Sequence, residues 1–231
     1  MMMRWVALLL AAGAGAQAPS PSLRIVLLVD TSDSMTNHIP FQRGDPTLLT
    51  DAAVGLAATL RQEEAVSVAT FGPTIHVSPA VLRREEIVRA ASAPSDRTGG
   101  ASPLWDALDA AVHSLDGTTG RRAIVVVTDG RPTGNRLPFA EILQTLQQAR
   151  VPVFFICAER PKQAKIADPS VRLRQIATAT GGQYYVIRSY SGLSRPKPDE
   201  LQRAIGHALD SIRMEPGGVF EDSPTNSRKI R

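Results

Sequence analysis

Apolar runs alternate with amphipathic helical patterns along this chain, and no other feature of the sequence constrains its fold as strongly. The first run, residues 23–29 (LRIVLLV), is almost continuously apolar, as is typical of a strand buried on both faces of a sheet. Similar runs follow at residues 65–71, 123–128, 153–158 and 184–187. Strands that alternate with helices are joined by right-handed crossovers, so the sequence predicts a mainly parallel sheet that is covered on both sides.

Four amphipathic stripes separate or follow these runs, and each repeats apolar residues at the spacing of one helix face. The stripes consist of Leu49, Ala53, Leu56 and Leu60; Leu104, Leu108, Ala111 and Leu115; Phe139, Ile142, Leu143 and Leu146; and Leu201, Ile205, Ala208 and Ile212. Proline at the first helical position, behind a capping side chain, marks the start of a helix. This signal occurs at Asp45-Pro46, Ser102-Pro103 and Asp168-Pro169.

One short segment breaks the alternation of strands and helices. Residues 74–77 (TIHV) closely follow the second apolar run and are predicted to return as its antiparallel hairpin partner. The expected fold class is therefore α/β: a doubly wound, mainly parallel six-stranded sheet with one short antiparallel edge strand and helices on both faces.

The composition fits one packed domain and excludes several classes of protein. Of the 231 residues, 43% are hydrophobic and 21% are charged, which allows a core and argues against wholesale disorder. The net charge of +4 is dispersed along the chain and aromatic residues make up only 5%, so no nucleic-acid partner is indicated. The single cysteine excludes a disulfide scaffold and a thiolate zinc module.

The N-terminus has the layout of a secretory signal peptide. Arg4 precedes an apolar run, and Ala14-Gly15-Ala16 offers a small-x-small cleavage site. The run is shorter than the roughly 20 residues needed to span a bilayer, although its retention as a membrane anchor is the alternative. We expect a secreted or periplasmic mature protein without a membrane span. The expected organisation is a signal peptide at residues 1–16, a linker at 17–22, one domain at 23–213 and a flexible tail at 214–231.

Polar segments occur where a parallel sheet places its ligand site, just beyond the carboxyl ends of the strands. Residues 30–35 (DTSDSM) follow the first apolar run, residues 128–132 (TDGRP) follow the third, and residues 98–106 (TGGASPLWD) lead into a helical stripe. All three segments are rich in carboxylate and hydroxyl oxygens and poor in histidine and cysteine. Such oxygen donors suit a hard divalent cation such as Mg²⁺ or Mn²⁺.

Together these segments resemble the metal-ion-dependent adhesion site of von Willebrand factor type A domains. The matching elements are Asp30-x-Ser32-x-Ser34, the Gly-Gly-x-Ser-Pro-Leu-x-Asp pattern of residues 99–106 and Thr128-Asp129-Gly130, and the resemblance covers residues 23–213. It implies that Ser32, Ser34 and Ser102 coordinate the cation directly, and that Asp30 and Asp129 hold it directly or through water. It also implies an open position for an aspartate or glutamate carboxylate of a partner protein.

Two positions depart from the family pattern. The family usually has threonine where this chain has Ser102, and serine keeps the oxygen donor but lacks the methyl group that restricts χ1. Thr98 is the second candidate for the same role. Asp33 stands where bacterial members often have glycine, and its carboxylate is expected to face water.

Each candidate also has a simpler interpretation. Ser102 before Pro103 could serve only as an N-cap, and Asp30 and Asp129 could be ordinary residues of strand-end turns. Three arginines flank the proposed loops, and they are either solvated charges or a positive rim that attracts an acidic partner: Arg97, Arg131 and Arg136.

No catalytic arrangement accompanies the oxygen-rich segments. A hydrolase of the haloacid dehalogenase type would need a second aspartate two residues after Asp30, where the chain has Ser32. The sequence contains no Gly-x-x-x-x-Gly-Lys loop and no Gly-x-Ser-x-Gly elbow. The expected function is a non-enzymatic, cation-dependent protein-binding domain. The alternatives are an assembly subunit of an exported complex and a fold that binds metal without a partner.

Overall fold

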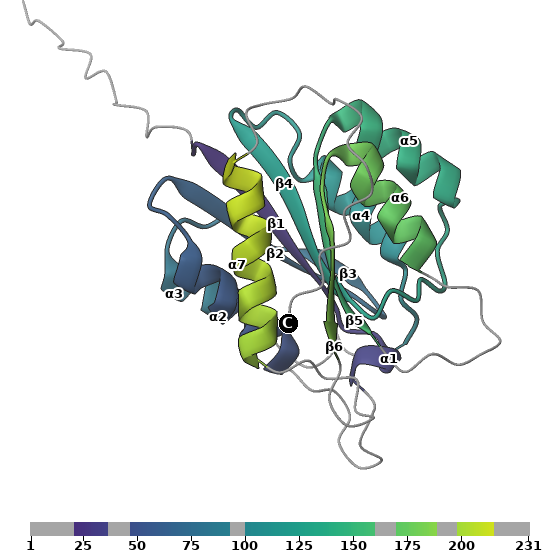
Figure 1. Cartoon of the computed structure of the whole chain (residues 1–231), viewed down its shortest axis with the longest axis horizontal. Coiled ribbons are helices and arrows are strands. Elements are labelled where there is room, and N and C mark those ends of the chain that lie inside the picture. The colour runs from purple at the N-terminus through teal and green to yellow at the C-terminus, as the bar shows by residue number, and fades with distance from the viewer. Residues whose placement is uncertain (1–20, 37–46, 93–99, 160–169, 189–197, 215–231) are drawn as a thin grey trace, which may run out of the picture.

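A six-stranded sheet forms the centre of the molecule (Figure 1). The computed structural model describes residues 21–36, 47–92, 100–159, 170–188 and 198–214. The strands are β1 (Leu23–Asp30), β2 (Glu64–Phe71), β3 (Ile75–Val77), β4 (Arg121–Thr128), β5 (Val153–Glu159) and β6 (Tyr184–Arg188). They are ordered β3-β2-β1-β4-β5-β6, with β3 antiparallel to β2 and all other neighbours parallel.

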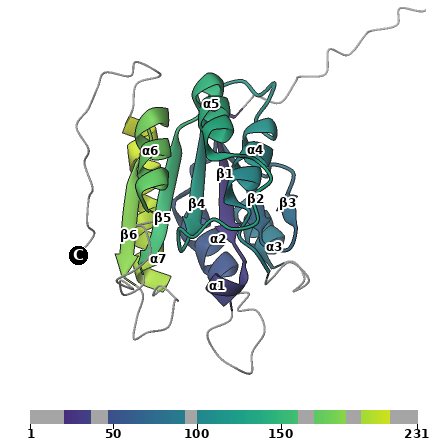
Figure 2. The same cartoon turned by 90° about the vertical axis from the view of Figure 1, so that its right-hand side faces the viewer.

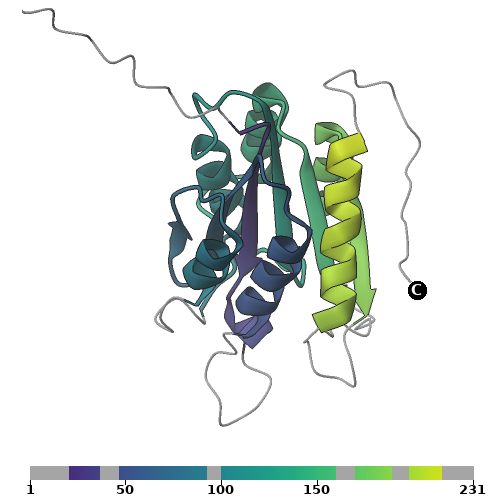
Figure 3. The same cartoon turned by 90° about the vertical axis from the view of Figure 1, so that its left-hand side faces the viewer.

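Helices cover both faces of this sheet. They are α1 (Asp33–Thr36), α2 (Thr47–Thr59), α3 (Arg84–Ala91), α4 (Leu104–His113), α5 (Phe139–Ala149), α6 (Ser170–Thr180) and α7 (Pro198–Met214). Helices α4, α5 and α6 pack on the face turned to the viewer in Figure 2, and α2, α3 and α7 pack on the opposite face, seen in Figure 3. The predicted doubly wound α/β fold is therefore confirmed.

The strands are apolar because both faces of the sheet are buried. In β1, Ile25 and Leu27 belong to the core cluster that includes buried residues of α2 and α7, whereas Val26 and Leu28 belong to the cluster that includes buried residues of α4 and α5. All five predicted apolar runs form strands. The predicted hairpin also forms, with Ala69 of β2 opposite Val77 of β3 in the register.

The helices are less completely predicted than the strands. No apolar stripe of the sequence predicts α3. Glu85 and Glu86 occupy its first turn, and Ile87 and Ala91 are its only buried residues, which are too few to form a stripe. Helix α4 begins one residue later than expected, so that Pro103 occupies the N-cap position instead of the first helical position. The prolines predicted to start α2 and α6, at positions 46 and 169, lie outside the described residues.

The order of the strands reverses between β1 and β4. From β1 the chain continues to β2 and β3 on one side of the sheet, and then crosses to β4, β5 and β6 on the other. The register places Val29 opposite Val127, so that Asp30 and Thr128 end neighbouring strands at the same edge. A parallel sheet binds its ligands at such a switch point, which is where the predicted cation segments lie.

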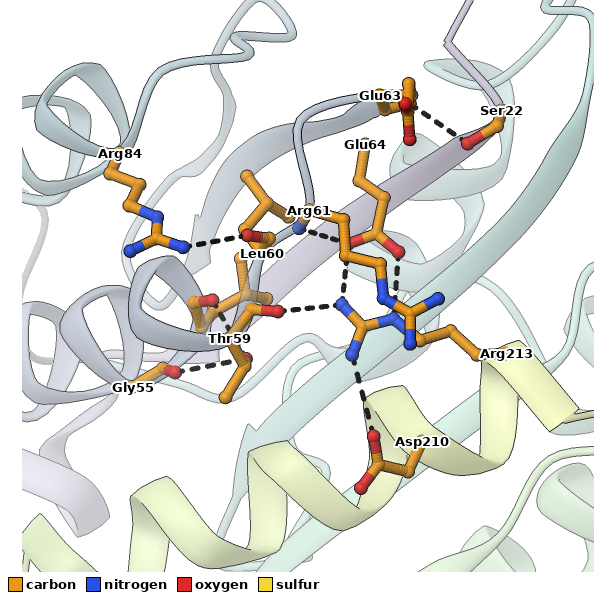
Figure 4. A network of polar contacts seen from close by, with 11 residues as sticks. Ser22, Gly55, Thr59, Leu60, Arg61, Glu63, Glu64, Arg84, Asp210 and Arg213 are labelled. Carbon is orange, nitrogen blue, oxygen red and sulfur yellow. Dashed lines mark hydrogen bonds and ion pairs between the residues drawn. The ribbon is translucent and has the colours of Figure 1, made fainter.

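A buried ion pair lies at the other end of the sheet, where β2 begins (Figure 4). Arg213 of α7 donates from Nε and Nη2 to the two carboxylate oxygens of Glu64, at 2.8 and 2.6 Å, and from Nη2 to the carbonyl of Thr59 at 2.8 Å. Arg121 of β4 donates to the carbonyls of Ile212 and Arg213. These contacts fasten the last turn of α7 to α2, β2 and β4.

Several predicted segments lie outside the described residues. They are the signal peptide at residues 1–16, most of the linker at 17–22 and the tail at 214–231 apart from its first residue. Helix α7 extends to Met214, one residue beyond the predicted end of the domain. Within the described ranges, no helix is long and apolar enough to cross a membrane.

Candidate metal-binding site

Three loops meet beyond the carboxyl ends of the central strands. Residues 31–36 follow β1 and include the short helix α1, which Figure 1 shows at the edge where the strand arrows end. Residues 100–103 precede α4, and residues 128–130 end β4 and begin the next loop. The N–H of Asp33 donates to the carbonyl of Gly100 at 3.1 Å and joins the first loop to the second. The fold therefore brings together the segments predicted to hold a cation.

Asp30 is the centre of the polar contacts between these loops. Its side chain is fully buried, and Oδ1 accepts hydrogen bonds from the N–H of Ser32 at 3.0 Å and from Ser32 Oγ at 2.5 Å. Its Oδ2 accepts from Ser102 Oγ at 3.0 Å and from Thr128 Oγ1 at 2.6 Å. Hydroxyl groups from all three loops thus converge on one carboxylate.

The electrostatics of Asp30 are dominated by its burial. Burial, helped by the nearby charge of Asp129, raises the pKa of Asp30 to about 6, although the hydrogen bonds from Ser32 and Thr128 act to lower it. Within the described part of the chain, Asp30 takes part in no ion pair with an arginine or lysine. The ionised carboxylate is therefore costly to bury unless a cation compensates its charge.

The first loop also contains Ser32, Ser34 and Asp33, which differ in how deeply they are buried. Ser32 is buried, and Ser34 Oγ lies 3.2 Å from Ser32 Oγ, so that the two serines continue the chain of contacts from Asp30. Asp33 between them is exposed, as predicted. The loop therefore separates two inward-facing hydroxyls from one carboxylate at the surface.

Asp129 lies directly after the neighbouring strand, β4. Its side chain is 8% exposed, and its Oδ1 accepts the N–H of Arg131 at 3.1 Å. Gly130 has φ of 79°, a backbone conformation that favours glycine, and its N–H donates to Thr128 Oγ1 at 3.1 Å. Because the charge of Asp129 contributes to the raised pKa of Asp30, the two carboxylates share one electrostatic environment.

The interpretation of Ser102 as an N-cap is wrong. The N-cap position of α4 belongs to Pro103, and no side chain of that position forms a capping hydrogen bond. The N–H of Trp105 instead donates to Asn135 Oδ1 at 2.7 Å, while Ser102 Oγ donates to Asp30. The hydroxyl of Ser102 therefore contacts Asp30 and does not cap α4, whose start is contacted by Asn135 from another loop.

Sequence reasoning missed four residues that build the site. Thr128 begins the Thr128-Asp129-Gly130 motif, and its position at the end of the strand beside Asp30 was the available signal. Asp106 ends the pattern of residues 99–106, and its carboxylate accepts the backbone N–H groups of residues 136 and 137. Thr133 and Asn135 carried no signal, because only the fold brings them to the start of α4.

The other candidates are placed less centrally. Thr98 and Arg97 lie outside the described residues, so that the second candidate for the Ser102 role stays a prediction. Arg131 is half-buried, and Arg136 is exposed with Nε 3.5 Å from Asp106 Oδ2. Both arginines follow Asp129 in the same loop and are therefore available as a positive rim.

The chemistry of the donor set fits a hard divalent cation. Among the described residues, no group of three or more histidine, cysteine, aspartate or glutamate side chains could hold a metal ion. A cation here would depend on two carboxylates together with hydroxyl oxygens, which suits Mg²⁺ or Mn²⁺. Ser32 and Ser102 donate their hydroxyl hydrogens to Asp30, so that oxygen lone pairs stay available for a cation.

Ser102→Ala is expected to weaken Mg²⁺ binding roughly tenfold, because it removes one oxygen donor and one hydrogen bond that orients Asp30. Ser102→Thr keeps the hydroxyl and should bind at least as tightly as the wild type, and Thr98→Ala should bind normally. Isothermal titration calorimetry measures all three affinities. Ser114→Ala is the control, since this hydroxyl lies at the other end of α4 and donates to Ala111. A loss with Thr98→Ala and none with Ser102→Ala would transfer the role to Thr98.

Comparisons with known proteins agree with this architecture. Residues 25–196 match the von Willebrand factor type A domain, and no curated protein matches the sequence. BatB from Bacteroides thetaiotaomicron has a similar structure, with a TM-score of 0.62 and 15% identity over 84% of this chain and 100% of that chain. An aerotolerance-related membrane protein from Bacteroides fragilis has a TM-score of 0.58 and 15% identity over 81% and 98%. The pilus adhesin SpaC from Lactobacillus rhamnosus GG has a TM-score of 0.59 and 15% identity over 85% and 31%.

Proposed function

The chain belongs to the von Willebrand factor type A domain family, a fold of protein interaction and adhesion, and we propose that it binds a partner protein through a divalent cation. The residues that would hold Mg²⁺ or Mn²⁺ are Asp30, Ser32, Ser34, Ser102 and Asp129. When bound, the cation would supply a Lewis-acidic position for an aspartate or glutamate carboxylate of the partner. In this proposal the domain binds its partner and catalyses no reaction.

The contacts of Asp30 are the observation that carries this proposal. A buried carboxylate that accepts hydrogen bonds from Ser32, Ser102 and Thr128 joins three loops, and it lies in the field of Asp129. Two carboxylates close together in a buried place repel each other, and a divalent cation between them would remove that repulsion. Packing alone does not explain this arrangement, because apolar side chains would fill the same space without the free-energy cost of burying a carboxylate.

The neutral ligands support a partner carboxylate as the remaining ligand. Asp30 and Asp129 supply two negative charges, which balance the cation, and the hydroxyl groups of the three serines add none. The cation would therefore stay electrophilic enough to accept one more carboxylate oxygen. Arg131 and Arg136 lie in the loop after Asp129, and their charges would attract an acidic partner during its approach.

An exported location is part of the proposal. The signal-peptide layout of residues 1–16 supports it, and two similar structures are a pilus adhesin and an aerotolerance-related membrane protein. We propose that the mature domain is secreted or periplasmic, and that it acts either as an adhesive module or as an assembly subunit of an exported complex.

A hydrolase of the haloacid dehalogenase type is the competing enzymatic function. Such an enzyme would place a second aspartate where this chain has Ser32, and the Ser32 hydroxyl is already engaged by Asp30. A serine at this position supplies no general acid or base near neutral pH. The residues around Asp30 therefore support binding better than catalysis.

Thermal unfolding in the presence of Mg²⁺ tests the proposal. The wild-type melting temperature should rise with the logarithm of Mg²⁺ concentration, because a ligand that binds only the folded state stabilises it. At a hundred times the dissociation constant the gain is about 2.7 kcal/mol, or roughly 5–10 °C for a chain of this size. Capture of exported proteins with and without EDTA then tests the partner.

Two outcomes would contradict the proposal. A melting temperature that is unchanged by Mg²⁺ and Mn²⁺ would remove the cation from the function. Cation binding without any EDTA-sensitive capture would favour the alternative in which the fold binds metal and has no partner.

A further inference from the structure

We propose that Asp106 and Thr133 are positioning residues of the metal site, an inference that rests on the function proposed above. Both act through residues 133–137, here called the clasp, which follow Asp129 in the chain and pack against residues 102–106. The clasp thereby connects the loop that carries Asp129 with the backbone of Ser102. Its role is to fix where the Ser102 hydroxyl lies relative to Asp129.

Thr133 holds both backbone polar groups of Ser102. Thr133 Oγ1 accepts the N–H of Ser102 at 2.9 Å, and the N–H of Thr133 donates to the carbonyl of Ser102 at 2.8 Å. The two groups flank the Cα atom of Ser102, so the pair of bonds fixes the direction of its Cα–Cβ bond. That direction sets the place of Oγ, which donates to Asp30. A residue that is held in this way has less conformational freedom to lose when a ligand binds.

Asp106 anchors the other end of the clasp. Its side chain is 7% exposed, and its carboxylate accepts the N–H of Arg136 at 3.0 and 3.2 Å and the N–H of Leu137 at 2.9 Å. A carboxylate in the first turn of α4 is also favoured by the helix dipole. These contacts explain why a carboxylate stands in this pattern although it is not among the proposed ligands.

The middle of the clasp packs closely on the start of α4. Asn135 Oδ1 accepts the N–H of Trp105 at 2.7 Å, which replaces the missing cap at the helix terminus. Gly134 has φ of 69°, and a Cβ atom at this position would lie 2.7 Å from the Cβ of Ala101. Only glycine permits this approach without a shift of the backbone. The clasp and the start of α4 therefore form one packed unit.

This unit would determine the affinity of the site. Asp129 precedes Thr133 by four residues, so the clasp links the loop of one proposed ligand to the backbone of another through a short stretch of chain. If either anchor is removed, the two loops move more independently. The free energy needed to align them is then subtracted from the free energy of cation binding.

Calorimetric titration of the full chain with Mg²⁺ tests the inference through two variants. They differ in the risk that the substitution disturbs folding. Thr133→Val removes only an acceptor on an exposed residue, and Asp106→Ala removes the buried anchor. Each should weaken Mg²⁺ binding roughly tenfold, the loss that is typical when a partner of a metal ligand is removed. Thr133→Ser keeps the acceptor and should retain wild-type affinity. Because both anchors hold one segment, the double variant should lose less than the product of the single losses.

Asp109→Asn is the matched control for charge. Asp109 lies on the same helix and pairs with His113, whereas the hydrogen bonds described for the clasp go to Ser102, Trp105 and Asp106, so the Mg²⁺ affinity of Asp109→Asn should equal that of the wild type. Equal losses with Asp106→Ala and Asp109→Asn would reduce the effect of Asp106 to its charge and overturn its positioning role.

The metal-free stability separates positioning from ordinary support of the fold. A Thr133→Val protein that melts at a lower temperature but binds Mg²⁺ with unchanged affinity would overturn the inference and leave the proposed function standing. A wild-type protein that binds no Mg²⁺ would overturn the proposed function, and the inference with it.

Discussion

Asp30→Ala is expected to abolish both the rise in melting temperature with Mg²⁺ and the EDTA-sensitive capture of a partner. The carboxylate of Asp30 accepts hydrogen bonds from Ser32, Ser102 and Thr128, so its removal deletes one ligand and releases the hydroxyls that it orients. Asp30 is the last residue of β1, and the apolar core begins below it. Calorimetry of the wild type and the variant over a series of Mg²⁺ concentrations measures the difference.

Two further variants sharpen this experiment. Asp33→Ala removes the exposed carboxylate of the same loop and should leave the Mg²⁺ titration unchanged. Asp30→Asn keeps the size of the side chain and removes its charge, so it separates loss of the ligand from the effect of a cavity. Identical titrations for wild type and both Asp30 variants would show that the adhesion-site interpretation is wrong.

Arg213→Ala should lower the free energy of unfolding by about 3–5 kcal/mol, the largest effect expected away from the site. The side chains of Arg213 and Glu64 are 12% and 4% exposed, and the pair is bidentate. The variant removes the cation that is paired with the buried carboxylate of Glu64, so that only Arg61 still compensates its charge, and it leaves the carbonyl of Thr59 without the donor from Arg213. Urea unfolding at neutral pH measures the loss.

Arg203→Ala on the same helix is the control for this variant. Arg203 is exposed and lies 4.0 Å from Asp199, so its removal should change the free energy of unfolding by no more than about 0.5 kcal/mol. Equal losses for the two arginine variants would show that the pair with Glu64 contributes no more than a surface contact.

The pH dependence of the same loss provides a second check. Burial by itself would raise the pKa of Glu64, but hydrogen bonds from Arg213 and the N–H of Arg61, together with their charges, lower the pKa below its usual value. A lowered pKa means that the stabilisation is present above the ordinary pKa of glutamate and is lost as the pH falls through the lowered value. The stabilities of wild type and Arg213→Ala should therefore converge in acid.

The sheet was predictable because its strands are buried on both faces. Each of the five apolar runs had to be a strand or a buried helix, and the intervening amphipathic stripes left the strand as the consistent choice. The hairpin after β2 followed from its position and its β-branched residues. Helix α3 was missed because Ile87 and Ala91 are its only two buried residues, and although they are one helical turn apart, two positions make no extended stripe.

The candidate site was predictable only as a set of residue types. Asp30, Ser32, Ser34, Ser102 and Asp129 stand at strand ends and before a helix, and these positions meet at the switch point of any doubly wound sheet of this order. Their role in holding a cation stays a prediction until it is measured. The N-cap interpretation of Ser102 failed because a capping residue and a residue that turns toward a distant carboxylate have the same local sequence.

The sequence by itself determined which segments become strands, which edge of the sheet collects the oxygen donors and which family the chain resembles. These properties depend on hydrophobic periodicity and on neighbours within a few positions, both of which are written along the chain. Only the tertiary structure decided that Thr128 contacts Asp30, that the clasp of residues 133–137 holds Ser102, and that Arg213 reaches Glu64. These contacts join residues 98, 31 and 149 positions apart. Hydrogen bonds over such separations depend on the packing of whole elements, and no local pattern encodes them.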